Sequence, residues 1–146
     1  MTAKGLLLAI GVITLPGMAA AQQQSVQLRL NNYSHQSLIC GIYYKIAAQC
    51  IKNRGSDDSI ALGNRYDSLS SDAVGESYET GKLAGVSEKA LLARSEIASR
   101  EMARDIEGKC VNISVLNLKH GDVCRQFIES REATLNSILR QMQGTR

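Results

Sequence analysis

Apolar residues recur at spacings of three and four along four segments of the chain, which is the pattern of a helix with one buried face. The segments cover residues 35–53, 57–82, 88–107 and 123–142. In the first of them the apolar stripe consists of Leu38, Ile39, Ile42, Tyr43, Ile46, Ala47 and Ile51. The pattern therefore predicts an all-α protein, a small helical bundle of three to four helices.

Capping residues place the ends of these helices. Gly55 follows the first segment and suits a helix C-terminus, and Ser56 or Asp57 suits the N-terminus of the second. Ser87 precedes the third segment in the same way. At residues 120–122 a glycine followed by an aspartate is typical of a helix that stops and restarts, so we expect the last helix to begin there.

The second segment is the weakest of the four. Gly63, Gly75 and several serines interrupt its apolar stripe. Each glycine inside a helix costs about 1 kcal/mol relative to alanine. We therefore expect a marginal helix that depends on packing.

Residues 109–119 fit two structures. The alternation of Val111, Ile113 and Val115 is typical of a strand, but the spacing also allows a helix. We favour a helix that continues the third segment, with Gly108 as the alternative end of that helix.

The first 21 residues have the three parts of a secretory signal peptide. Lys4 supplies a positive charge, residues 5–15 are apolar, and residues 19–21 are alanines that a signal peptidase can cleave. An apolar core this short cannot span a bilayer of about 30 Å as a helix. We therefore expect cleavage of residues 1–21, export to the periplasm or beyond, and no stable membrane insertion afterwards.

The remaining chain is expected to hold one domain. Residues 22–34 are a polar lead-in that we expect to be loose, and residues 35–146 form a single helical domain. The formal net charge of the whole chain is +3, and its basic residues are interspersed with acidic ones. Such a surface has little field to attract nucleic acid, so we expect no nucleic-acid partner.

The four cysteines are expected to form two disulfides, because an exported chain enters an oxidising compartment. Cys40 and Cys50 would lie about 15 Å apart along one helix, whereas a disulfide needs Cα atoms within about 7 Å. Both must therefore pair with Cys110 and Cys124, and either pairing staples the first helix to the C-terminal half of the bundle.

The heights of the cysteines in an up-and-down bundle choose between the two pairings. If the third helix runs on past residue 110, Cys50 is level with Cys124 and Cys40 is level with Cys110. We therefore expect the bridges Cys40–Cys110 and Cys50–Cys124, which place the second helix at the periphery. If Gly108 instead ends the third helix, the nested pairing of Cys40 with Cys124 and Cys50 with Cys110 replaces it.

The sequence offers little catalytic or cofactor chemistry. Covalent haem attachment needs a C-x-x-C-H motif, which the chain lacks, and His35 and His120 lie at predicted helix ends. The cysteines are too widely spaced for a zinc site or a thioredoxin-like redox motif. A hydrolase would need one of the two histidines beside a nucleophile. We expect no catalytic residue, no metal ion and no cofactor.

Tyr43 and Tyr44 are the one candidate binding feature. Adjacent helix residues point about 100° apart, so one tyrosine can be buried while the other is exposed. Tyrosine is enriched in protein interfaces, and an exposed one here would suit a partner surface. The alternative places both tyrosines at the margin of the core.

Together these features predict a periplasmic or secreted protein that acts as a non-catalytic interaction module. It would be an accessory or adaptor subunit, an inhibitor or a chaperone of an envelope system, with another envelope protein as its partner. The alternative is a protein that binds or hydrolyses a small ligand in a pocket between helices. An apolar patch around the tyrosines would favour the first function, and a cleft with convergent polar groups the second.

Overall fold

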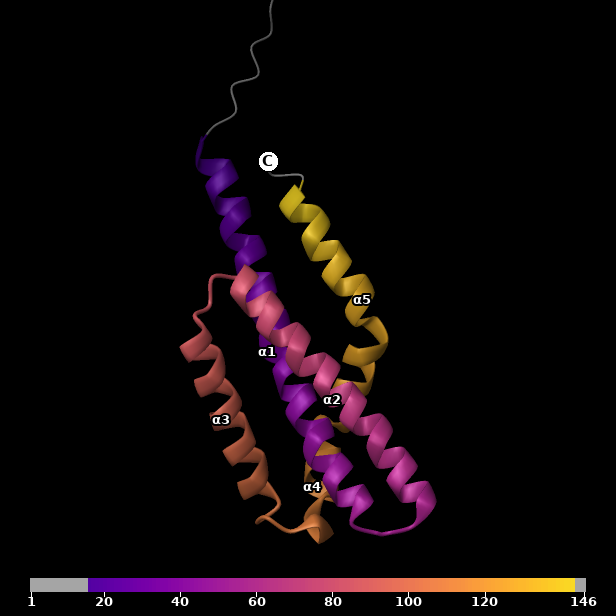
Figure 1. Ribbon diagram of the computed structural model, residues 1–146. Helices are drawn as coiled ribbons and strands as arrows, with labels where there is room; N and C mark the ends of the chain where they lie inside the picture. Colours follow the sequence, from indigo (N-terminus) through magenta and orange to yellow (C-terminus); the bar gives the residue numbers. More distant parts are fainter. Residues whose placement is uncertain (1–15, 144–146) are drawn as a thin grey trace, which may run out of the picture.

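The computed structural model describes residues 16–143, which form an up-and-down bundle of four long helices without strands (Figure 1). The predicted all-α class is confirmed. The long helices are α1 (Pro16–Lys52), α2 (Asp57–Leu83), α3 (Glu88–Asp105) and α5 (Asp122–Gln143). A 3₁₀ turn (Cys110–Asn112), the short α4 (Ser114–Leu116) and a π turn (Asn117–Gly121) connect α3 to α5. Within the described residues, no helix combines the length and apolar character needed to cross a membrane.

Helix α1 is the central element, and it extends through residues 22–34, which were expected to be loose. That prediction is wrong because Val26, Leu30 and Tyr33 form a second apolar stripe, buried against Ile138 of α5. Residues 1–15, which contain most of the predicted signal peptide, lie outside the described part of the chain.

Helix α2 packs more extensively on α1 than any other element does, so its predicted place at the periphery is also wrong. The residues that weakened its sequence pattern form the interface, because small side chains let two helix backbones come close. Its buried residues are Gly63, Ser70, Ala73, Ser77, Thr80 and Gly81. Helix α3 makes far less contact with α1, and its buried residues are Leu91, Ala98 and Met102.

Buried serines connect α1 to the backbone of α2. The Ser34 hydroxyl donates to the Ser77 carbonyl oxygen at 2.7 Å, and the Ser37 hydroxyl donates to the Ala73 carbonyl oxygen at 2.8 Å. Both α1 serines are almost completely buried. Because every buried hydroxyl needs a partner, these two bonds help to fix the register between the helices.

Helix α3 ends at Asp105 and does not continue through residue 119. Glu107 and Gly108 adopt left-handed backbone angles, with φ of 52° and 67°, and the Gly108 amide donates to the Ala103 carbonyl. Such a left-handed turn terminates a helix. The segment after it is helical from Ser114 onward, but it joins α5 through the π turn. At residues 120–122, where one helix was expected to stop and the next to begin, the helical backbone instead continues through the π turn into α5.

The disulfides are nested: Cys40 pairs with Cys124, and Cys50 pairs with Cys110, each with a Cα–Cα distance of 5.1 Å. The expected pairing of Cys40 with Cys110 and Cys50 with Cys124 is wrong. The cause is the turn at Gly108, which leaves Cys110 at the lower end of the bundle beside the end of α1. Cys124 then lies in the first turn of α5, where it bonds to Cys40 of α1. The prediction that the disulfides staple α1 to the C-terminal half is confirmed.

Candidate functional site

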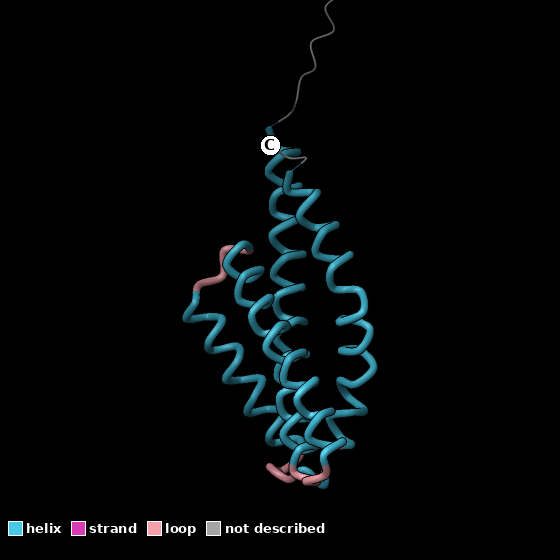
Figure 2. The backbone as a smooth tube through the Cα atoms, turned by 45° about the vertical axis from the view of Figure 1, so that its right-hand side comes forward, coloured by secondary structure: helices cyan, strands magenta, loops and turns pink. Residues whose placement is uncertain are grey.

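Helices α2 and α5 both pack on α1 but make little direct contact with each other. Figure 2 shows the returning α4–α5 segment bowed away from the rest of the bundle. Three hollows follow one another along this seam, and each is lined by residues of α2 and of the returning segment. We call this feature the α2–α5 groove. Its lower end lies at the Cys50–Cys110 bridge and its upper end near Leu135.

The middle hollow has a volume of about 370 Å³. Its floor is aromatic and aliphatic, and its rim carries charged side chains from both helices. The floor consists of Tyr43, Tyr44, Tyr66, Leu69 and Ile128, and the charged residues are Arg65, Arg125 and Glu129. Arg125 also forms an exposed ion pair with Asp122 at 3.0 Å. The arrangement offers apolar contact below and ionic contact at the edges.

Tyr43 and Tyr44 are both buried, with 5% and 6% of their surface exposed. The expectation that one of them projects as a partner surface is therefore wrong. The Tyr43 hydroxyl donates to Asn117 Oδ1 at 3.1 Å. The Tyr44 ring meets the Tyr66 ring edge to face, with centroids 5.2 Å apart. The two tyrosines form the floor of the groove, while the partly exposed Tyr66 is the aromatic residue that a ligand would reach.

The lower hollow, of about 240 Å³, shares Tyr43 and Tyr66 with the middle one. The Cys50–Cys110 disulfide forms part of its wall, together with Leu62 of α2. Its polar lining residues are Asn117 and Arg54. The groove thus ends at a covalent crosslink.

The upper hollow, of about 360 Å³, is acidic. Its lining includes Asp72, Glu76 and Glu132, with Arg131 as the one basic side chain. An Arg131 nitrogen lies 3.6 Å from an Asp72 oxygen, so one ion pair spans α2 and α5. Glu76 Oε2 is buried, and the Glu76 carboxylate is a hydrogen-bonding neighbour of the Tyr33 side chain.

Charge therefore changes sign along the groove. The lower and middle hollows carry Arg54, Arg65 and Arg125 against one carboxylate, Glu129. The upper hollow carries three carboxylates against one arginine. A ligand that follows the groove meets a basic rim first and an acidic rim further up.

Burial raises the pKa of Tyr43 to about 12. It also raises the pKa of Tyr44, with the neighbouring Tyr66 as the next largest cause. Burial, followed by the nearby Glu76 carboxylate, raises the pKa of Tyr33 beside the upper hollow. Tyr43 and Tyr44 therefore keep their protons at neutral pH. They can act as hydrogen-bond donors but not as bases.

Neither histidine lines the three hollows, although the His120 ring lies 6.2 Å from the ring of Tyr43 in the groove floor. His35 is exposed on α1. His120 is half-buried on the α3 side of the returning segment, where burial and then Lys119 lower its pKa. Between residues 16 and 143 no group of three histidine, cysteine or acidic residues is placed to hold a metal ion. The absence of a catalytic residue and of a cofactor stays a prediction.

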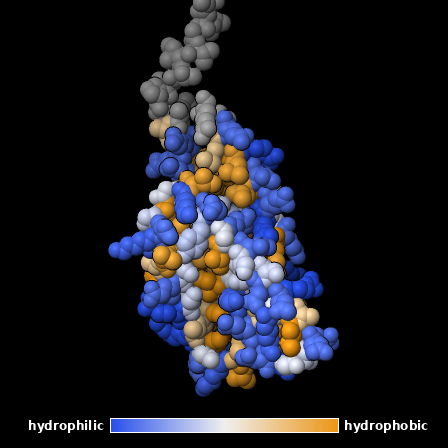
Figure 3. All heavy atoms as spheres, viewed as in Figure 1, coloured by the Kyte–Doolittle hydropathy of each residue, from blue (hydrophilic) through white to orange (hydrophobic). Residues whose placement is uncertain are grey.

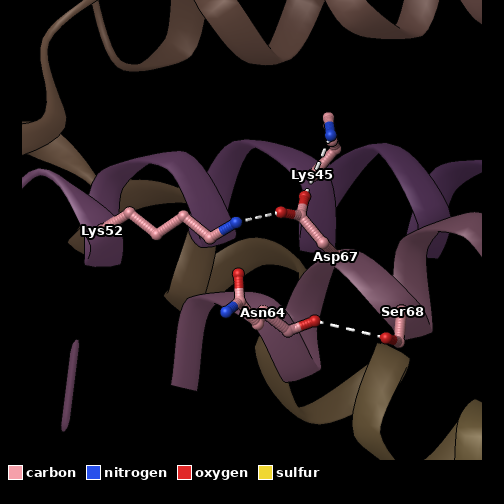
Figure 4. A network of polar contacts seen from close by, with 5 residues as sticks. All are labelled: Lys45, Lys52, Asn64, Asp67 and Ser68. Carbon is pink, nitrogen blue, oxygen red and sulfur yellow. Dashed lines mark hydrogen bonds and ion pairs between the residues drawn. The ribbon is translucent and has the colours of Figure 1, made fainter. Parts of the chain in front are cut away.

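An ionic cluster outside the groove holds α1 against α2 (Figure 4). Asp67 of α2 accepts hydrogen bonds from Lys45, at 2.9 Å, and from Lys52, both on α1. The Lys52 and Lys45 bonds lower the pKa of Asp67. This cluster fixes the lower half of the α1–α2 pair, on which the groove is built.

Apolar side chains also reach the surface outside the groove. Figure 3 shows them as separate patches among charged residues, one of them over the upper part of α5. The most exposed are Val111 and Leu118, with 83% and 89% of their surface accessible, at the two ends of the segment around α4. The sequence reasoning did not identify Leu118, nor the groove residues Tyr66, Arg65 and Arg125. The only available signal for them was the spacing of Tyr66, four residues after Leu62 and three before Leu69, which is that of a buried helix face.

Comparisons of the chain with protein-family models, with curated proteins and with solved structures found no match.

Proposed function

We propose that the protein is a non-catalytic interaction module that binds a segment of a partner protein in the α2–α5 groove. The observation that carries the proposal is the groove itself, an aromatic and aliphatic floor between charged rims contributed by two helices that hardly touch. Apolar and aromatic contacts inside a polar rim are the usual composition of a protein interface.

The chemistry of the groove supports binding rather than catalysis. Tyr43 and Tyr44 keep their protons at neutral pH, and the half-buried His120, 6.2 Å from the Tyr43 ring, lines a hollow on the α3 side of the returning segment. The remaining polar groups are arginines and carboxylates, of which Arg125 and Arg131 already form ion pairs. Such groups orient a ligand by charge.

The compartment that we propose is the periplasm or the extracellular space. Both disulfides are formed and no cysteine among the described residues is free. Disulfides of this kind persist in oxidising compartments and are rare in the cytosol. The predicted signal peptide points in the same direction, and the partner would then be another envelope protein.

The dimensions and charges of the groove define the kind of segment that fits. Along α2 the groove runs from Leu62 to Glu76, which is about 20 Å at the helical rise. That length matches a helix of about four turns. Charge complementarity favours a segment with an apolar face, an acidic group near Arg65 and Arg125, and a basic group near Glu76.

Site-specific photo-cross-linking in the producing cell tests the proposal. A photoreactive residue at position 65, on the groove rim, should give an adduct with a defined protein. The same residue at position 100, exposed on α3, should not. A photoreactive residue can also replace Leu69 in the groove floor. The double substitution R65E/R125E should weaken cross-linking of the partner from that position, while R100E/R104E on α3 should leave it unchanged. Equal cross-linking from positions 65 and 100, or none from position 65, would refute the proposal.

A second candidate function is small-ligand binding in the lower hollow. It is favoured by the convergence of Asn117, Arg54 and the Tyr43 hydroxyl around one 240 Å³ space. A ligand held there should raise the melting temperature of the wild-type chain, and N117A should abolish that shift. Photo-cross-linking from position 65 would be unaffected by such a ligand if the partner protein binds only in the middle and upper hollows.

A further inference from the structure

The two disulfides differ sharply in their access to solvent. Cys40 and Cys124 have no exposed surface, and their bridge lies inside the main core cluster. Cys50 is 6% exposed, while Cys110 is only half-buried and lines the lower hollow of the groove. A reagent from solvent can therefore approach one bridge and not the other while the protein stays folded.

We propose that the Cys50–Cys110 bridge is a site of thiol–disulfide exchange in the folded protein, open to an external thiolate at Cys110, and that Cys40–Cys124 stays closed. The co-reactant is a thiolate, supplied either by a small thiol such as glutathione or by a protein dithiol. The inference is independent of which ligand the groove binds.

The exchange is balanced at every step. The external thiolate attacks Cys110 Sγ, a mixed disulfide forms at Cys110, and Cys50 leaves as a thiolate that takes a proton from water. Cys50 can then attack the mixed disulfide, which restores the bridge and releases the external thiol. Full reduction needs a second external thiolate, and the two external sulfurs end as a disulfide.

The surroundings of Cys110 suit this reaction. Arg54 lines the same hollow, so one cation lies on the approach of a thiolate, whereas the neighbouring Lys109 pairs with Glu107 at 3.8 Å. Asn53 Nδ2 lies 3.7 Å from Cys110 Sγ and can donate to the sulfur. A cation on this approach attracts the external thiol and favours its reactive thiolate form, while the greater exposure of Cys110 makes its sulfur the one that is attacked.

The segment that carries Cys110 is a short, irregular connection rather than part of a long helix. It consists of the turn at Glu107 and Gly108 and a single 3₁₀ turn, which join α3 to the returning helix. After the bridge opens, Cys40–Cys124 still ties the returning helix to α1. Because Cys50 and Cys110 form a wall of the lower hollow, opening the bridge lengthens the α2–α5 groove at that end.

Peptide mapping of the folded full chain after timed exposure to reduced glutathione tests the proposal. Free thiols are trapped with an alkylating reagent and located by mass spectrometry. We expect Cys50 and Cys110 to be released at least ten-fold faster than Cys40 and Cys124, with glutathione attached to Cys110. In denaturant the two bridges should open at similar rates. Equal rates in the folded protein, or glutathione attached to Cys124, would overturn the proposal.

Two further arms identify the source of the thiol and the role of the local charge. In the first, an oxidoreductase with a C-x-x-C dithiol replaces glutathione at equal thiol concentration. If the Cys50–Cys110 bridge opens faster than with glutathione, the site is assigned to a protein dithiol; if it opens more slowly, the site is assigned to small thiols. In the second arm, R54E should slow attack by glutathione several-fold, whereas R100E on α3 should not. If R54E and R100E behave alike, attack does not pass through the lower hollow and the proposed route is wrong.

Discussion

Gly41 of α1 lies directly against the backbone of α2 at Ser70. A Cβ atom added to Gly41 would lie 3.2 Å from the Ser70 carbonyl oxygen and 2.6 Å from Val74 Cγ2. The two helices can approach this closely only because α1 carries no side chain at that point.

The first prediction concerns this contact. G41A should destabilise the protein by about 1–3 kcal/mol, because the added methyl group overpacks a tight interface, although alanine favours a helix by about 1 kcal/mol over glycine. The matched control is G75A on α2, where an added Cβ meets nothing within 4 Å. G75A should stabilise by up to about 1 kcal/mol. Urea unfolding followed by circular dichroism measures both, and destabilisation by both variants would contradict the close approach.

The second prediction concerns Asp67. Because Lys52 and Lys45 lower its folded-state pKa, its stabilising contribution is present above the unfolded-state pKa of about 4. The contribution is lost as the pH falls through the lower, folded-state pKa. D67N should therefore be less stable than the wild type at pH 7, and the gap should close in acid. E79Q, at an exposed position of α2, serves as the control. A gap that persists unchanged in acid would mean that the ion pairs do not cause it.

The third prediction concerns Tyr43. Its pKa is raised to about 12 by burial, so its phenol must lose a proton more easily in the unfolded chain, where the pKa is about 10. The associated stability is complete below pH 10 and is lost between pH 10 and 12. Y43F removes this titration but also the hydrogen bond to Asn117. Phenolate absorbance followed against pH measures the titration in both proteins. One tyrosine that titrates late in the wild type should be missing from the Y43F curve. If the tyrosine that is missing from the Y43F curve titrates near pH 10 in the wild type, the burial of Tyr43 is contradicted.

The fourth prediction concerns the order in which the disulfides form. In the unfolded chain Cys40 and Cys50 are only ten residues apart, whereas the native pairs are separated by 84 and 60 residues. The loop-closure entropy makes the local contact roughly ten-fold more frequent. Oxidation of the reduced, unfolded chain by ferricyanide, without any free thiol, should therefore trap the Cys40–Cys50 bridge.

Helix α1 cannot form around that bridge, because it holds these two residues about 15 Å apart. A mixture of reduced and oxidised glutathione should let the trapped chain rearrange to the nested native pairs, seen by peptide mapping. Native pairs as the main product of ferricyanide oxidation would show instead that α1 folds before the cysteines react.

The candidate site could be predicted only in part. Tyr43 and Tyr44 were singled out on the first helix as a possible exposed surface, but their sequence positions do not reveal that two further helices cover them. Arg65 and Arg125 meet across the groove from helices that are far apart in sequence. No local pattern connects them, so only their positions in space identify them as two sides of one rim.

The sequence by itself determined the helical class, the capping serine at Ser87, and the fact that Cys40 and Cys50 cannot bridge each other within one helix. Each of these depends on spacing within one helix, where geometry is fixed by the backbone. Only the tertiary structure decided the disulfide pairing, the helical state of residues 22–34 and the close packing of α2 against α1. These depend on which surfaces come into contact: a glycine or serine that weakens an isolated helix becomes the reason that two helices pack closely.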